Sequence, residues 1–335
     1  MNDSPQPLSS IARATVGRLA PSPTGGLHLG NARTFLLAWL LARRQIGRII
    51  FRMEDLDSTR AIQEAASQAL HDLRWLGLDW DEGPDLGGPS APYNQSQRAS
   101  IYQSALNRLI DLNLVYPCTC TRSDVARAAS APHANDAQPA YPGTCSLRHA
   151  QEALALDELA KPFAWRFRSA GRTVAWNDQI RGPQSHDLDK IGGDFIVARS
   201  GSVFAYQLAV VVDDAAMGVT QVVRGHDLMD STPRQVLIQQ ALGLAQPDYW
   251  HVGLVLGPDG QRLAKRDQSI KISQIRGSGV LPGQLVAMLA KSLGLEVTLD
   301  ALGLSPADLV NPDWSEPNLN WRDDWIWSSH RLHEV

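Results

Sequence analysis

The sequence predicts an α/β protein whose doubly wound parallel sheet is split by an inserted segment. Short apolar runs alternate with helix-like segments over residues 16–115, and the alternation returns over residues 196–300. Residues 116–195 lack this alternation and contain all the cysteines of the chain. Strands that alternate with helices favour a parallel sheet with helices on both faces. We therefore expect one sheet built from two stretches of sequence.

Length and composition indicate a globular protein rather than a disordered, fibrous or membrane-spanning one. Of the 335 residues, 44% are hydrophobic and 20% are charged, which is ordinary for a globular chain. No apolar run reaches the ~18 residues of a membrane span. Residues 1–15 form a polar leader that we expect to be flexible, and they lack the pattern of a secretory signal. We therefore expect a cytoplasmic location. Because the net charge is −4, contact with nucleic acid would need a local basic patch.

The first half begins with an apolar run, Val16–Ala20, that enters the loop Pro21–Gly26. This pattern predicts a strand and a short connection to a helix that starts near Leu29, where leucines recur at helical spacing. The next expected elements are a strand, an amphipathic helix capped by Ser58 or Thr59 and ending near Leu76, and a further helix. The strand covers Ile49–Met53 and the further helix covers Gln97–Leu112.

The second half resumes the pattern after the insertion. Within 116–195, the residues around Phe163–Trp176 are typical of β-structure. The βα pattern returns at Phe204–Val212, Val219–Val223, Pro233–Leu242 and Val252–Leu256. Residues 301–335 form a tail with several tryptophans among polar residues, and its pattern indicates no function.

The cysteines are Cys118, Cys120 and Cys145. An odd number, with two of them one residue apart, is poorly suited to a structural disulfide. Spacing alone leaves two interpretations open, which are the burial of unrelated thiols and a structural zinc site with three thiolates and one further ligand. By spacing, His133 and His149 are candidates for that further ligand.

The loop from Pro21 to Asn31 joins the first strand to the first helix and contains Gly25, His28 and Gly30. Backbone N–H groups at a helix start favour phosphate, and glycines permit close approach of a nucleotide. His28 is suited to stabilise charge that develops on a transferring phosphate. The loop therefore predicts a Rossmann-like nucleotide site, with a plain strand-to-helix turn as the alternative.

A second segment, Arg262-Leu-Ala-Lys265-Arg266, follows a Gly-Pro-Asp-Gly turn. A short run of cations is often a solvated surface. The alternative is a mobile loop at the far end of the split sheet, where Lys265 would neutralise a leaving pyrophosphate.

These two segments resemble the HIGH and KMSKS signatures of the class I aminoacyl-tRNA synthetases. His28, Gly30 and Lys265 match the signatures. Three positions depart from them, namely Asn31, Arg262 and Ala264. The stretches that are similar to the glutamyl subgroup of these enzymes are Gly17–Gly25, Phe51–Asp57 and Gly218–Asp227, so the resemblance covers roughly residues 15–275.

The resemblance implies an enzyme that uses ATP, with Mg²⁺, to activate glutamate as an acyl-adenylate. Arginines suit the carboxylates of glutamate, and Glu54 suits its α-ammonium. The implied ATP-binding residues, of which His28 and Lys265 would be catalytic, are Gly25, His28, Gly30, Asn31 and Lys265. The implied glutamate-binding residues are Arg18, Ser22, Glu54, Tyr206 and Arg224. Resemblance to glutamyl-Q tRNA(Asp) synthetases implies a zinc site with Tyr141 as the ligand beside the three cysteines, in place of either histidine.

About 70 residues follow Arg266, fewer than a typical additional domain of ~100–150 residues. A full glutamyl-tRNA synthetase carries a separate anticodon-binding region at that point. The resemblance therefore implies a glutamyl-Q tRNA(Asp) synthetase, which attaches glutamate to the queuosine base in the anticodon of tRNA(Asp). We expect a monomer whose partner is that anticodon stem-loop. The alternatives are a truncated glutamyl-tRNA synthetase that charges a tRNA 3′ end and a non-catalytic RNA- or nucleotide-binding paralogue.

Overall fold

The protein is represented by a computed structural model. It describes residues 13–23, 25–56, 60–128, 140–169, 171–260, 263, 270–295, 297, 304–310 and 320–327.

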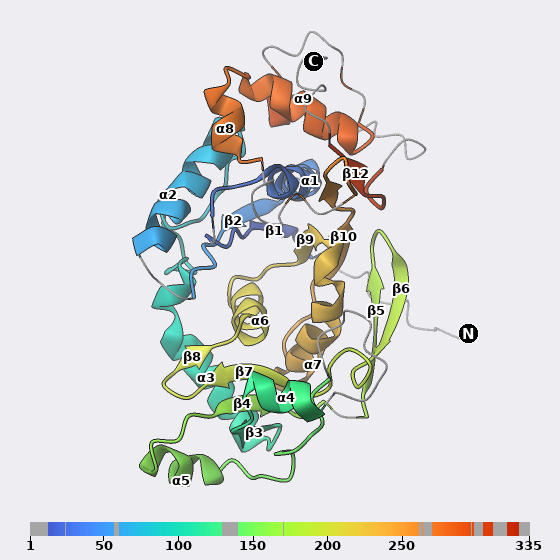
Figure 1. The fold of residues 1–335 in the computed structure, drawn as a ribbon. Helices are drawn as coiled ribbons and strands as arrows, with labels where there is room; N and C mark the ends of the chain where they lie inside the picture. The colour runs from blue at the N-terminus through green and yellow to red at the C-terminus, as the bar shows by residue number, and fades with distance from the viewer. Residues whose placement is uncertain are drawn as a thin grey trace, which may run out of the picture.

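A parallel sheet lies at the centre of the molecule and takes strands from both halves of the sequence (Figure 1). Within each half the two strands pair in parallel. The two pairs are joined where the backbone N–H of Thr220 donates to the carbonyl of Val16 at 2.9 Å. The predicted parallel α/β arrangement is therefore confirmed. In spatial order the strands are β2 (Arg48–Phe51), β1 (Val16–Leu19), β9 (Gln221–Gly225) and β10 (Asp248–Val252).

Helices cover the sheet, and their ends follow local sequence signals. The predicted helix α1 is confirmed as Leu29–Arg44, with buried side chains from Leu29 to Ala42. A proline stands in the first turn of α7 (Thr232–Leu242), and Gly243 ends this helix with a φ of 67°, a conformation that favours glycine. No helix in these described ranges is both long and apolar enough to cross a membrane. The other helices packed around the core are α2 (Arg60–Trp75), α3 (Ala99–Asp111), α6 (Tyr206–Ala216), α7 (Thr232–Leu242), α8 (Ile272–Gly277) and α9 (Pro282–Ser292).

The segment 116–195 contributes to two different sheets. One is an antiparallel sheet at the lower end of Figure 1, with the short helices α4 (Arg122–Ala128) and α5 (Glu152–Glu158) beside it. The strands of this sheet are β3 (Val115–Cys118), β4 (Ala164–Phe167), β7 (Phe195–Arg199) and β8 (Val203–Phe204). The β-structure expected around Phe163–Trp176 is confirmed. In the run Phe204–Val212, only Phe204 lies in a strand, β8, and the residues from Tyr206 onward lie in the helix α6 (Tyr206–Ala216).

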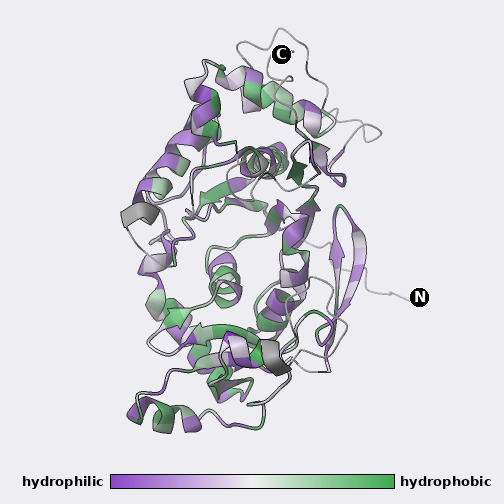
Figure 2. Cartoon of the chain, viewed as in Figure 1, coloured by the Kyte–Doolittle hydropathy of each residue, from purple (hydrophilic) through white to green (hydrophobic). Residues whose placement is uncertain are grey.

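A hairpin from the same segment extends the central sheet. It comprises β5 (Thr173–Asp178) and β6 (Gly182–Asp187), and β5 pairs in parallel with β10 where Asp178 faces Tyr249. Every second residue of β5 is buried, and Figure 2 shows the hairpin mostly in hydrophilic and neutral colours. One face of β5 is therefore buried, with α7 (Thr232–Leu242) among the elements in contact with the strand, and its other face is exposed to solvent.

Residues 320–327 pack against α1 and the segment that follows β10. β11 (Val255–Leu256) pairs in parallel with β12 (Trp325–Ile326). From α1, the buried guanidinium of Arg33 donates to the carbonyls of Gly253 at 2.7 Å and Asn320 at 2.9 Å. A Cβ at Gly253 would overlap the carbonyl of Asp323, so a glycine is required for this close approach.

Candidate functional site

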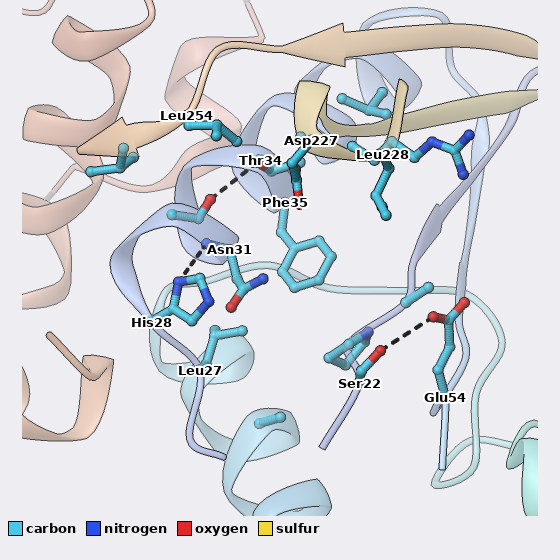
Figure 3. A pocket seen from close by; sticks show the side chains of 18 of the residues that line it. Ser22, Leu27, His28, Asn31, Thr34, Phe35, Glu54, Asp227, Leu228 and Leu254 are labelled. Carbon is cyan, nitrogen blue, oxygen red and sulfur yellow. Dashed lines mark hydrogen bonds between the residues drawn. The ribbon is translucent and has the colours of Figure 1, made fainter. Parts of the chain in front are cut away.

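A cavity of about 580 Å³ opens at the carboxyl ends of β1 and β9, where ligands bind in open parallel sheets. Figure 3 shows His28 and Asn31 at one end of it and Ser22 and Glu54 at the other. Of the expected ATP and glutamate residues, all except Lys265 line this cavity. Lys265 lies outside the described residues. The structure therefore brings together Arg18, Ser22, Gly25, His28, Gly30, Asn31, Glu54, Tyr206 and Arg224.

The end of the cavity that contains His28 is built on the start of α1. His28 is the N-cap residue of this helix, and its Nδ1 accepts a hydrogen bond from the backbone N–H of Asn31 at 3.4 Å. That bond fixes the imidazole at the helix start. A Cβ at Gly25 would meet no atom within 4 Å, so the loop leaves open space at the position where the helix dipole favours a phosphate.

Lys271 is a cation at this end that the sequence motifs did not reveal. It lies in the segment after the Lys265 loop, and it forms an isolated antiparallel bridge with His28. Its stem lies over Gly26, where an added Cβ would be 3.3 Å from the Lys271 Cδ. Lys271 lines the cavity and makes no ion pair with the residues that the structure describes. A lone lysine beside a motif carries little signal in a sequence, because surface lysines are common.

The opposite end of the cavity carries Glu54, placed just beyond β2. Arg52 Nη2 donates to Glu54 Oε1 at 3.0 Å, and the Ser22 hydroxyl donates to Glu54 Oε2 at 3.4 Å. These two donors orient the carboxylate, which retains accepting capacity for a cationic group of a ligand.

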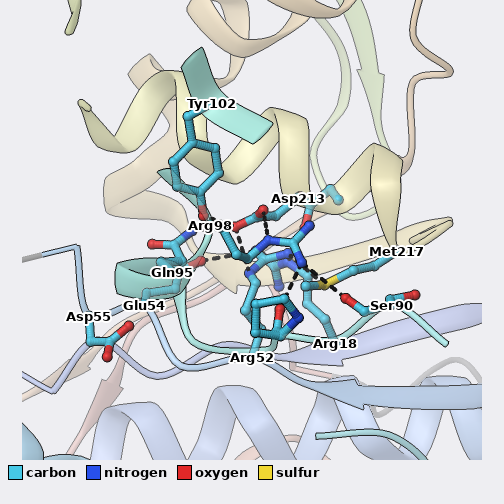
Figure 4. A network of polar contacts seen from close by, with 12 residues as sticks. Arg18, Arg52, Glu54, Asp55, Ser90, Gln95, Arg98, Tyr102, Asp213 and Met217 are labelled. Atoms are coloured by element: carbon cyan, nitrogen blue, oxygen red, sulfur yellow. Dashed lines mark hydrogen bonds and ion pairs between the residues drawn. The ribbon is translucent and has the colours of Figure 1, made fainter. Parts of the chain in front are cut away.

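Behind Glu54 lies a buried network of arginines and aspartates (Figure 4). Arg52 pairs with Asp214 at 2.7 Å, and Arg98 pairs with Asp213 at 2.6 Å. Arg18 lies 3.4 Å from the same Asp214. Each of these buried arginines therefore has a carboxylate partner, as burial of charge requires.

Arg224, at the end of β9, differs from these arginines. Its side chain is buried and donates to neutral partners, from Nη2 to the Thr232 hydroxyl at 2.8 Å and from Nε to His251 Nε2 at 3.1 Å. Its Nη1 is buried without a hydrogen-bond partner in the described part of the chain. A buried guanidinium without a carboxylate is costly. The geometry therefore favours an anionic ligand at this edge of the cavity.

Tyr206 stands at the first position of α6 and lines the same end of the cavity. Burial raises the pKa of its phenol, the charge of Arg224 opposes this shift, and Glu54 adds to it. The hydroxyl therefore stays protonated at neutral pH and can donate to a carboxylate.

His251 and Asp178 also belong to the surroundings of the site, although sequence motifs did not reveal them. His251 Nδ1 lies 2.5 Å from Asp178 Oδ2, and both side chains are fully buried. Burial lowers the pKa of His251 to about 4, Asp178 opposes the shift, and Arg224 adds to it. The imidazole is therefore neutral at physiological pH. Only the pairing of β5 and β9 with β10 brings these residues together, so no local pattern could reveal them.

The three cysteines converge beside the antiparallel sheet. All three Sγ atoms lie within 4.8 Å of one another, and the Sγ atoms of Cys120 and Cys145 are 3.7 Å apart. Tyr141 Oη lies 3.3 Å from Cys118 Sγ and accepts a hydrogen bond from the Cys145 N–H at 2.8 Å. His149 does not belong to this cluster, and His133 lies outside the described residues.

This donor set fits a tetrahedral zinc ion. With a zinc–sulfur distance of about 2.3 Å, two ligating sulfurs lie ~3.8 Å apart, close to the distance between Cys120 and Cys145. The guanidinium of Arg166 lies 3.8 Å from the centroid of the Tyr141 ring. Burial and the neighbouring Cys118 thiol raise the pKa of the Tyr141 phenol, so the hydroxyl would lose its proton only on binding the metal.

Comparison with known proteins gives a consistent result. Residues 14–301 match the family model "tRNA synthetases class I (E and Q), catalytic domain". The chain is 52% identical to a glutamyl-Q tRNA(Asp) synthetase of Symbiobacterium thermophilum, over 83% of this chain and 86% of that protein. It is 43% identical to glutamate–tRNA ligase 1 of Halorhodospira halophila, over 86% of this chain and 61% of that protein.

A solved structure supports the same assignment. The crystal structure of glutamate-tRNA synthetase from Elizabethkingia anophelis matches with a TM-score of 0.80 at 27% identity, covering 95% of this chain and 69% of that chain. Fold, cavity and sequence agree, and the chain belongs to the class I tRNA synthetases (E and Q).

Proposed function

We propose that this chain activates L-glutamate with ATP and transfers the glutamyl group to the queuosine base in the anticodon of tRNA(Asp). The relative that is 52% identical over most of both chains is a glutamyl-Q tRNA(Asp) synthetase. The observation within the site that supports a glutamate pocket is the buried edge of Arg224, which lines the cavity without a carboxylate partner.

The end of the cavity away from His28 would bind the two groups of glutamate that do not react. Arg224 Nη1 and Arg18 bind the side-chain carboxylate, with the Tyr206 hydroxyl as a further donor. Glu54 accepts a hydrogen bond from the α-ammonium. The α-carboxylate then points towards His28 and the start of α1. This orientation matches the cavity, because Glu54 and Ser22 lie across it from His28 and Asn31 (Figure 3).

Activation requires the α-carboxylate oxygen to attack the α-phosphorus of ATP, with the bond to pyrophosphate breaking in line. The start of α1 binds phosphate through its backbone N–H groups, and His28 donates to charge that develops on the reacting phosphate. Lys265 would neutralise the leaving pyrophosphate, and Mg²⁺ bound with ATP would supply further positive charge there. The products of this step are glutamyl-adenylate and pyrophosphate.

Transfer requires a hydroxyl of the acceptor to attack the carbonyl carbon of the adenylate, with AMP as the leaving group. The anticodon loop enters the same cavity in this proposal, so that its modified base reaches the adenylate. Unpaired bases and local phosphate contacts would hold the loop, consistent with a protein whose net charge is −4.

Zinc has a structural part in this proposal. Cys118, Cys120, Tyr141 and Cys145 would hold it, and the ion would cross-link the loop 140–145 to the end of β3. All four positions would be occupied by protein ligands, so the site has no open coordination position for substrate chemistry.

The proposal is tested with two acceptors and one control. Glutamate-dependent exchange of pyrophosphate into ATP, without RNA, tests activation. A queuosine-bearing anticodon stem-loop of tRNA(Asp) is expected to accept glutamate, and removal of the 3′-terminal adenosine from intact tRNA(Asp) is expected to change little. Transfer that requires this adenosine and ignores queuosine would instead identify a glutamyl-tRNA synthetase. That alternative has support in the 43% identity to a glutamate–tRNA ligase.

A further inference from the structure

A buried chain of hydrogen bonds leads away from the cavity through Arg224. Its members lie on neighbouring strands, with Arg224 on β9, His251 on β10 and Asp178 at the end of β5. Strand pairing places Arg224 directly opposite His251. The exposed fractions of these residues are 4%, 0% and 1%, so water does not compete for their hydrogen bonds.

The Asp178 carboxylate fixes the tautomer of His251. It accepts from Nδ1–H at 2.5 Å, and the backbone N–H groups of Ile180 and Arg181 hold the carboxylate at 3.1 and 2.9 Å. A hydrogen on Nδ1 leaves a lone pair on Nε2 of a neutral imidazole. That lone pair faces Arg224 Nε at 3.1 Å. A protonated imidazole would instead present a cation to the guanidinium.

Thr232 completes the support of the guanidinium. Its hydroxyl oxygen accepts from Arg224 Nη2 at 2.8 Å and lies 3.1 Å from His251 Nε2, so the hydroxyl can donate to the same lone pair. Arg224 also lies over the ring of Tyr249, with 5.2 Å between the guanidinium carbon and the ring centroid. Two donor groups and one face of the guanidinium are thereby fixed, and Nη1 remains available to donate to a ligand in the cavity.

We propose that His251, with Asp178 behind it and Thr232 beside it, is a positioning residue that aims the guanidinium of Arg224 at the side-chain carboxylate of the amino-acid substrate. This inference rests on the proposed glutamate activation. A positioned donor loses less conformational freedom when the carboxylate binds. Loss of the acceptor on His251 therefore weakens binding of glutamate without touching the ATP end of the cavity.

The test uses the glutamate-dependent exchange of pyrophosphate into ATP by the full chain. His251→Leu removes the acceptor, whereas His251→Gln replaces Nε2 with an amide oxygen. Gln221→Leu is the matched control, because Gln221 is buried on the same strand as Arg224 and makes no hydrogen bond to it within the described residues. A hydrogen bond to a charged group corresponds to about a 10- to 100-fold change in binding.

His251→Leu is therefore expected to raise the KM for glutamate by about 10- to 100-fold, with the KM for ATP within about twofold of wild type. His251→Gln is expected to restore most of the loss. Combining His251→Leu with Asp178→Ala is expected to add little, since both act through one chain of bonds. Thr232→Val, an isosteric change, is expected to raise the same KM by a smaller factor and provides a second measurement if His251→Leu does not fold.

Several outcomes would overturn the inference. One is that His251→Leu and Thr232→Val have the same KM for glutamate as the control Gln221→Leu. A second is that His251→Leu raises the KM values for glutamate and ATP equally. A third is that His251→Gln does not restore glutamate binding. Failure of the proposed function is distinguishable, because wild-type protein would then show no glutamate-dependent exchange.

Discussion

Acidification from pH 7.5 to pH 5 is expected to destabilise this protein through the buried imidazole of His251. Burial lowers the pKa of His251 to about 4 in the folded state, Asp178 opposes the shift, and Arg224 adds to it. In an unfolded chain the pKa of histidine is about 6.5. Between these two values the unfolded state binds a proton that the folded state does not. The contribution of His251 to stability is therefore complete above about pH 6.5, decreases as the pH falls towards 4, and is constant below that.

The expected size follows from the two pKa values. At pH 5 the unfolded imidazole is mostly protonated and the folded one is mostly neutral, and the difference amounts to about 2 kcal/mol of unfolding free energy. Asp178 also has a lowered pKa, since its hydrogen bond and attraction to His251 outweigh the effect of burial. An aspartate with a lowered pKa loses its contribution to folding stability only below about pH 4. That range lies outside the interval from pH 7.5 to pH 5.

Urea unfolding of wild-type protein and of His251→Gln at pH 7.5 and pH 5 measures this effect. Both proteins contain the same cysteine cluster and the same other histidines. The effect of pH on these groups therefore contributes equally to the loss of unfolding free energy in the two proteins and cancels in the comparison. Wild type is expected to lose about 2 kcal/mol more than the variant over this interval. Equal losses in the two proteins would refute the assignment of a neutral, buried imidazole.

Three further predictions concern the nucleotide and the metal. Lys265→Ala is expected to lower the rate of pyrophosphate exchange by about 100-fold or more while direct calorimetry still detects glutamate binding, because the cation serves the transition state; equal loss of glutamate affinity would contradict this. Lys271→Met is expected to raise the KM for ATP by up to about tenfold, with the KM for glutamate unchanged, and Lys271→Arg should retain ATP binding. Elemental analysis is expected to find one zinc per chain, and Cys118→Ser to lose it and to impair transfer to RNA more than activation; protein purified without zinc would end the metal hypothesis.

Local sequence patterns predicted the elements that depend on local contacts. The run Val16–Ala20, the helix from Leu29 and the strand over Ile49–Met53 form β1, α1 and β2 with small differences at their ends. Apolar periodicity is sufficient there, because each segment buries its own apolar side chains. Those of α1 lie in one hydrophobic cluster, and those of β1 and β2 are divided between that cluster and a second one. The alternation of strands and helices also predicted that the cavity residues lie at strand ends.

Features that depend on distant pairing could not be predicted in this way. Asp178 lies within the segment 116–195, yet its strand pairs with β10 of the central sheet. No periodicity in β5 specifies β10 as its partner. The same reason applies to His251, whose place between Trp250 and Val252 indicates no partner, and to Trp325, whose strand pairs with β11.

The pairing of β11 with β12 has a consequence for synthesis on the ribosome. Gly253 and Leu254 form part of the cavity wall, and their N–H groups donate to the carbonyl of Trp321 at 2.8 Å and to the carboxylate of Asp324 at 2.6 Å. At ~5–20 residues per second, the ribosome needs several seconds to proceed from this wall to the residues that support it. A nascent chain that has just completed β10 would contain every residue of the glutamate pocket, but not the segment that holds the adjoining wall. We therefore expect the ability to activate glutamate to arise only after residues 320–327 have left the exit tunnel.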